Sequence, residues 1–128
     1  MKTSLIKNTL LLLFITIIAL SCSSTKKGGS GNISVANTVW SGFDSDGDYY
    51  EYTFKRNGKV DFRNSSNGSS DTSSYSDDID VWKQEGSKVT WVLTEYATWI
   101  GEVRGNKMSG TASNIVDKNW TFSFSKKK

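Results

Sequence analysis

Apolar and polar residues alternate with a period of two from Asn37 onward, and no stretch of this region sustains a helical period. Aromatic residues share one face in two of these stretches: Tyr50, Tyr52 and Phe54 in the first, and Trp120, Phe122 and Phe124 in the second. The alternation predicts strands at residues 38–43, 49–55, 59–63, 75–84, 88–94, 96–104, 107–113 and 119–125.

Turn signals separate the predicted strands. Asn57-Gly58 is a strong hairpin signal because both residue types tolerate positive φ, and Ser, Asn, Asp and Gly dominate residues 64–74, which predicts a long loop. Consecutive strands joined by short loops can close on themselves, which removes the exposed edges of a sheet. We therefore expect an all-β fold, a single antiparallel meander forming an eight-stranded up-and-down barrel, with a rolled sheet or a sandwich as the alternative.

The start of the chain has a different pattern. After Lys2 and Lys7, the uncharged stretch from Asn8 to Leu20, ahead of Ser21 and Cys22, is 13 residues long, fewer than the roughly 20 that a membrane-spanning helix needs. The sequence ALSC at residues 19–22 resembles the bacterial lipobox. The resemblance implies that residues 1–21 are a cleaved signal peptide and that Cys22 carries diacylglycerol, often with further acylation of its new amino group. Cys22 is the only cysteine of the chain, so no intramolecular disulfide can form.

This anchor sets the expected organisation of the mature protein. Residues 22–36 are expected to be the lipidated Cys and a flexible, Gly- and Ser-rich linker, and residues 37–128 the barrel domain. Neither an Asp nor an acidic run follows Cys22, a pattern compatible with the periplasmic face of an outer membrane. The expected location is therefore the cell envelope, with the membrane as a partner through the lipid anchor.

Charge separates the body of the domain from its ends. Residues 37–125 contain nine Lys and Arg against 13 Asp and Glu, whereas Lys26, Lys27 and residues 126–128 make both ends of the mature chain basic. An acidic body without a basic stripe argues against nucleic acid as a partner. Basic ends could touch anionic head groups, although terminal lysines are more commonly a solubilising tail.

The opening strand also carries a resemblance. Trp40-Ser41-Gly42 is similar to the start of lipocalin, avidin and related calycin-type barrels, in which a Trp near the first strand closes one end. Thr38 stands two residues before Trp40, where lipocalins usually have Gly. Residues 101–111 and 120–122 resemble small lipocalin-like bacterial lipoproteins. The resemblance implies the barrel architecture and assigns no binding residue.

The composition leaves few enzymatic options. The chain has no His, and acylation would occupy Cys22, so Ser-His and Cys-His nucleophiles and zinc sites of Cys and His are excluded. Asp44, Asp46 and Asp48 alternate in a loop as calcium ligands do, but Gly47 and Lys55 stand at the wrong positions for an EF-hand. We interpret this segment as a polar turn, and Asp77, Asp78 and Asp80 as a solvated strand end, with no metal or cofactor expected.

The aromatic residues are the remaining candidate site. A small apolar ligand could bind between Tyr50, Tyr52, Phe62, Trp91 and Trp120, as small-molecule sites are mostly apolar. The same residues could instead be a solid core, which would make the protein a structural or interaction lipoprotein that contacts an envelope protein. Tyr49, Trp82 and Trp99 fall outside the expected inward pattern and would suggest a contact surface if exposed.

Overall fold

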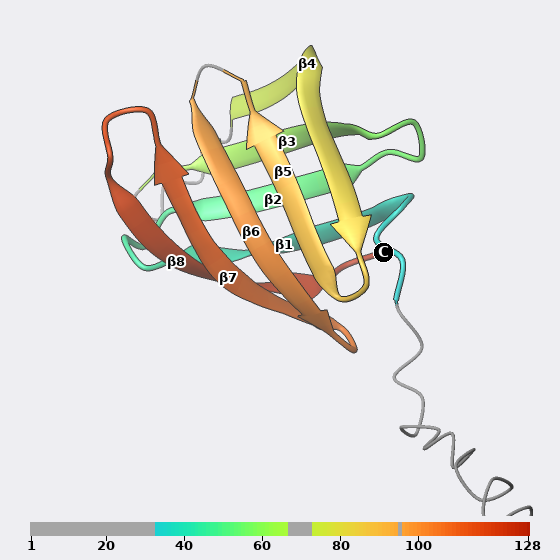
Figure 1. Cartoon of the computed structure of the whole chain (residues 1–128). Coiled ribbons are helices and arrows are strands. Elements are labelled where there is room, and N and C mark those ends of the chain that lie inside the picture. The colour runs from blue at the N-terminus through green and yellow to red at the C-terminus, as the bar shows by residue number, and fades with distance from the viewer. Residues whose placement is uncertain (1–32, 67–72, 95) are drawn as a thin grey trace, which may run out of the picture.

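The computed structural model describes residues 33–66, 73–94 and 96–128, so the expected signal peptide, Cys22 and most of the linker lie outside the described residues. Figure 1 shows eight strands wound into one barrel. Their bounds are β1 Thr38–Asp44, β2 Tyr49–Phe54, β3 Lys59–Ser65, β4 Ser73–Glu85, β5 Lys88–Leu93, β6 Ala97–Arg104, β7 Lys107–Asn114 and β8 Asn119–Lys126.

Each strand pairs antiparallel with the next one along the chain, and β8 pairs with β1 to close the barrel. The closing register places Trp40 opposite Lys126 and Asp44 opposite Phe122. The predicted eight-stranded up-and-down barrel is thus confirmed, and the rolled-sheet and sandwich alternatives are wrong. Within the described part of the chain, no helix is long and apolar enough to cross a membrane.

The barrel has two ends that differ in which connections they carry (Figure 1). Both ends of the described chain lie at the terminal end, together with the β2–β3, β4–β5 and β6–β7 turns. The β1–β2, β3–β4, β5–β6 and β7–β8 connections lie at the opposite, distal end.

The strands β3 and β4 are longer than the sequence indicates. Asn64 and Ser65 belong to β3, and Ser73 and Ser74 belong to β4, although all four were expected in the loop at residues 64–74. Residues 67–72 of that loop lie outside the described residues. Ladder hydrogen bonds to a neighbouring strand have overridden the low strand propensity of Ser and Asn.

Inward-facing side chains fill the barrel as the period of two predicts for β2, β5 and β8. The fully buried members with the largest side chains include Trp40, Tyr52, Phe54, Trp91, Trp99 and Phe124. Trp99 was expected outside this pattern, and that expectation is wrong, because β6 begins at Ala97 and turns Ala97, Trp99, Gly101 and Val103 inward. Gly101 leaves the room that Met108 and Phe122 occupy.

Trp82 and Tyr49, the other two aromatic residues outside the expected inward pattern, are half-buried, unlike the fully buried Trp99. Trp82 is half-buried, packs edge-on against Phe54 at 5.6 Å between ring centroids, and donates its indole N–H to the Lys55 carbonyl at 2.8 Å. Tyr49 is half-buried and packs edge-on against Phe43 on the outer surface. Neither ring is therefore a fully exposed contact surface.

Glycine allows two close approaches between strands. A Cβ atom on Gly42 would collide with the carbonyl oxygen of Ser123, and one on Gly110 with that of Ile100. Side chains at these positions would force the β1–β8 and β6–β7 pairs apart, so the coiling that closes the barrel depends on both glycines. Gly42 belongs to the motif that carries the resemblance to calycin-type barrels.

The terminal end is closed by the segment that precedes β1. Val35, assigned to the linker from the sequence, is fully buried in the core. The side chain of Gln84 accepts a hydrogen bond from the Val35 N–H at 3.0 Å and donates to the Ile33 carbonyl at 2.7 Å. The Trp40 indole donates to the Thr38 hydroxyl at 2.7 Å, which in turn donates to the Val35 carbonyl.

Candidate functional site

Four of the five predicted ligand-binding residues lie in a packed network of rings. Tyr50, Tyr52, Trp91 and Trp120 are buried, with Tyr52 and Trp91 at zero exposure. The Tyr52 ring lies 5.2 Å from Trp91, and other rings of the network are separated by similar centroid distances. These separations are those of direct aromatic contact, so the rings fill the space they enclose.

Several polar atoms inside this network have no hydrogen-bond partner among the described residues. They are the Tyr52 hydroxyl and the indole Nε1 atoms of Trp91, Trp99 and Trp120. An unpaired buried donor costs roughly 1–3 kcal/mol, which makes such a group unusual in a folded protein. The three indoles lie within three residues of the distal ends of their strands.

Burial also perturbs the two inward-facing tyrosines. It raises the pKa of Tyr52 well above the ordinary value of 10.0, and the nearby Trp91 side chain opposes part of that shift. Burial likewise raises the pKa of Tyr50, with a further increase from the charge of Asp44. Both phenols therefore stay neutral at physiological pH and offer the O–H group as a donor.

A pocket of about 370 Å³ opens at the distal end, and we call it the mouth. Its lining residues come from β3, β4, β5 and the β5–β6 connection: Phe62, Asn64, Tyr75, Asp77, Asp80, Leu93, Thr94 and Tyr96. Phe62 is the fifth predicted ligand-binding residue and stacks on Tyr75 at 4.7 Å. Phe62 also contacts Tyr52 at 5.9 Å and so connects the mouth to the inner network.

An irregularity in β4 shapes one wall of the mouth. The register between β3 and β4 shifts between Lys59 and Asp61, and residues 77–80 form the extra segment on the β4 side. Asp80 points inward here, is 5% exposed, and accepts a hydrogen bond from the Thr94 N–H at 2.9 Å. Burial raises the pKa of the Asp80 carboxyl, although the Thr94 bond opposes the shift. The expectation that Asp80 belongs to a solvated strand end is therefore wrong.

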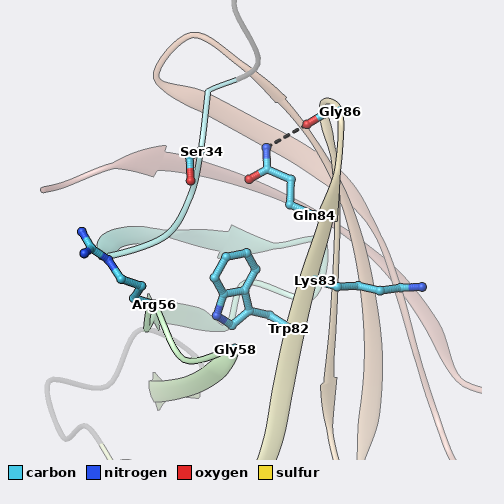
Figure 2. A pocket seen from close by; sticks show the side chains of 7 residues that line it. All are labelled: Ser34, Arg56, Gly58, Trp82, Lys83, Gln84 and Gly86. Atoms are coloured by element: carbon cyan, nitrogen blue, oxygen red, sulfur yellow. Dashed lines mark hydrogen bonds between the residues drawn. The ribbon is translucent and has the colours of Figure 1, made fainter.

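A larger hollow, of about 460 Å³, lies at the terminal end. Figure 2 shows Trp82 on its floor, with Arg56 on one side and the Gln84 amide bonded to Gly86 on the other. Lys83 comes from the same strand and points away from the hollow (Figure 2). The lining of this hollow is more polar and more basic than that of the mouth.

The acidic β1–β2 turn is organised by its own carboxylates. Asp44 accepts hydrogen bonds from the backbone N–H groups of Asp46 and Asp48, each at 2.9 Å, and Asp46 pairs with Lys118 at 2.5 Å. Burial is the main cause of the raised pKa of Asp44. Among the described residues, no three acidic, His or Cys side chains group as metal ligands would. The turn interpretation thus has a structural basis in these bonds.

Sequence reasoning did not single out most of the mouth. Tyr75, Leu93, Thr94 and Tyr96 belong to three different segments, and only the β4 irregularity and the barrel curvature bring them together. The one local signal was the acidic group at residues 77–80 beside the serine-rich segment. Acidic residues inside a predicted strand are a cue for a bulge, because they are poor strand formers.

Comparisons with protein-family models, with curated proteins and with solved structures find no match to this chain.

Proposed function

We propose that the protein is a lipid-anchored binding protein of the cell envelope, not an enzyme, whose barrel takes up a small apolar, ring-bearing ligand at the mouth. The signal-peptide pattern and Cys22 support the anchor. The observation that carries the ligand site is the mouth itself, a pocket at the distal end with aromatic walls and a few polar groups. Its volume of about 370 Å³ falls in the range of small-molecule sites.

The walls of the mouth suit a flat apolar ligand. Tyr75 and Tyr96 are about half exposed, at 48% and 51%, so a ligand lying against them would cover apolar surface that water now touches. The Phe62–Tyr75 stack offers a preformed aromatic face. A ring against such a face gains about 0.5–1.5 kcal/mol beyond simple burial.

The polar groups of the mouth restrict the class of ligand further. Asp77 and Asp80 place carboxylates in the pocket, and the raised pKa of Asp80 reflects the cost of holding that charge away from water. A ligand with an N–H donor or an amine would offset this cost. The ligand class proposed is therefore a ring-bearing molecule with a donor or cationic group.

Mass spectrometry of protein made in a bacterial envelope tests whether a ligand is carried. A native mass above that of the bare chain, which falls to the bare mass on denaturation, would identify a bound molecule and its size. Titration with N-phenyl-naphthylamine, a neutral aromatic probe, tests the site directly. The probe should become fluorescent on binding, and Tyr75→Ala should weaken binding by about tenfold or more, as expected for an aromatic anchor.

Phe43→Ala is the matched control, because Phe43 is 56% exposed but lies on β1, outside the mouth. Probe affinity should not change in this variant. Equal loss in Phe43→Ala and Tyr75→Ala, or a bare native mass together with no probe binding, would contradict the ligand site.

A second function is favoured by a different observation. Ile115 and Val116 form an apolar β7–β8 tip that is 76% and 74% exposed, and the Ile115 N–H bonds to the Tyr96 carbonyl beside it. Such a tip suits contact with another envelope protein, and the densely packed rings fit a solid core. In that case Ile115→Ser with Val116→Ser should abolish cross-linking to envelope proteins while the aromatic probe fails to bind the parent protein.

A further inference from the structure

Charge is divided between the two ends of the barrel. At the terminal end lie ten cationic side chains and the four acidic side chains that form ion pairs with them. The other described residues comprise two cationic and seven acidic side chains. The ten cations are Lys55, Arg56, Lys59, Lys83, Lys88, Arg104, Lys107, Lys126, Lys127 and Lys128. The four acids are Glu51, Asp61, Glu85 and Glu102.

Pairing leaves much of this positive charge unneutralised. Lys55, Lys83, Arg104 and Lys127 each pair with one of the four acids. Arg56, Lys88, Lys126 and Lys128 are exposed and have no ion pair within the described part of the chain. They come from the β2–β3 turn, the start of β5 and the end of β8, so the charge surrounds the terminal end instead of following one strand.

The chain enters the barrel at this same end. Ile33 and Val35 are fixed there by Gln84, and only residues 23–32 lie between Ile33 and Cys22. From Cys22 to Ile33 the chain can span at most about 40 Å even when fully extended. A lipid on Cys22 would therefore keep the basic end close to the membrane surface.

We propose that the terminal end docks onto anionic phospholipid head groups of the membrane that holds the lipid anchor. The inference takes its location from the anchor of the proposed function and is independent of the ligand. Phosphate groups of the lipids supply the charge that the unpaired cations lack, and each Lys or Arg at such a surface contributes about fivefold to binding. Trp82, half-buried in the hollow beside Arg56, lies where an aromatic ring can meet the head-group layer (Figure 2).

Docking in this direction also orients the mouth. An anionic surface repels the acidic distal end, so the domain is held with its terminal end toward the membrane and the mouth toward the aqueous compartment. The mouth then stays open to ligands while the domain rests on the bilayer.

Vesicle sedimentation of the unacylated mature chain, residues 23–128, tests the proposal without the anchor. Every rung of the closed barrel lies between Thr38 and Lys126, so this chain retains the whole fold. The protein should bind phosphatidylcholine vesicles only when they contain phosphatidylglycerol, and the binding should weaken as salt rises. Arg56→Gln with Lys88→Gln and Lys126→Gln should lower the partition coefficient about 100-fold.

Two control variants make the test specific. The charge-conserving triple Arg56→Lys, Lys88→Arg and Lys126→Arg should bind as the parent does. Another triple, Val116→Glu, Asn119→Glu and Thr121→Glu, lowers the net charge equally but before and near the distal end of β8, where Thr121 and Asn119 are about 17 and 24 Å from Lys126 along the strand. Such charges lie beyond the screening length of about 10 Å at 0.1 M salt and should change binding less than twofold.

The proposal is overturned if the neutralised triple binds like the parent or if the distal triple loses as much. The aromatic-probe titration, run on the same proteins without vesicles, keeps the two proposals separate. Loss of vesicle binding with intact probe binding concerns the docking surface, and the reverse concerns the mouth.

Discussion

The terminal and distal ends of the barrel differ in whether their buried polar groups have hydrogen-bond partners. At the terminal end the indoles of Trp40 and Trp82 both have oxygen acceptors, and Gln84 uses both ends of its amide. Towards the distal end the described indoles of Trp91, Trp99 and Trp120 have none. The first arrangement closes the fold, whereas the second leaves indole N–H groups without a hydrogen-bond partner in the distal half of the core.

Carboxyl groups show the same division. The pKa of Glu51 is lowered, mainly by its hydrogen bond from Lys127 of the terminal end, whereas burial raises the pKa of Asp44 and Asp80 at the distal end. Satisfied groups add stability, and unsatisfied or desolvated groups subtract it. The distal end thus gives up stability in the region where binding is proposed, a common trade-off at functional sites.

The largest expected effect is a difference in unfolding free energy between a substitution in the inner ring network and one in the wall of the mouth. Trp91→Ala should lower the free energy of unfolding by about 3–5 kcal/mol, because it removes a fully buried ring that contacts four other aromatic rings. Tyr75→Ala should cost less than about 1 kcal/mol, because half of its side chain already faces water. Urea unfolding followed by Trp fluorescence measures both.

A Trp91→Ala cost below that of Tyr75→Ala would show that the network is loosely packed and has space for a ligand inside. In that event Trp91 would belong to the ligand site, as the sequence-based prediction of Tyr50, Tyr52, Phe62, Trp91 and Trp120 has it.

The next largest expected effect is a loss of stability when the hydrogen bonds that close the terminal end are removed. Gln84→Ala removes the partners of the Val35 N–H and the Ile33 carbonyl and should cost about 1–3 kcal/mol of unfolding free energy. Proteolysis near Ile33 should also become faster. Lys83→Ala, the exposed neighbour with a 3.5 Å ion pair, is the control and should change stability by less than about 0.5 kcal/mol. Equal effects would mean that the segment before β1 adds nothing to the barrel.

How far the sequence predicts this molecule depends on the range of the interactions. Alternation in β2, β5 and β8 reflects one residue facing in and the next facing out, so strands, faces and the closed barrel were predictable. In β6 the inward residues include Ala97 and Gly101, whose small size hides the period, and Trp99 was misplaced for that reason.

The mouth was less predictable than the barrel. Its shape depends on a register shift between β3 and β4, and its lining residues meet only after the sheet has curved and closed. Likewise, the sequence indicates basic residues only at the two ends of the mature chain. Arg56 and Lys107 are about 50 residues apart in the sequence and come to the same end of the barrel through the up-and-down topology alone.

A smaller effect compares two indoles directly. Trp40→Phe and Trp120→Phe remove the same volume from the core, but only Trp40 loses a hydrogen bond, the one to Thr38. Trp40→Phe should therefore cost about 1 kcal/mol more than Trp120→Phe, measured by urea unfolding. An equal cost would indicate that the Trp120 indole has a partner in solution, such as an ordered water.

The smallest expected effect is on the pH dependence of stability, to which Glu51 and Asp80 contribute with opposite signs. The lowered pKa of Glu51 means that its stabilising contribution is complete above the ordinary value of 4.5 and is lost as pH falls through the folded-state value. The raised pKa of Asp80 has the opposite sign: its contribution is most favourable below the ordinary value of 3.8 and declines as pH rises through the folded-state value.

Urea unfolding over a pH series on two isosteric variants tests these signs. Glu51→Gln should flatten the loss of stability at acidic pH, because the charge attraction to Lys127 is already gone. Asp80→Asn keeps an acceptor for the Thr94 N–H and should gain stability relative to the parent at neutral pH but not below pH 3.8. If Asp80→Asn instead loses stability at neutral pH, the Asp80 carboxylate has a cationic partner, and the cost assigned to the distal end disappears.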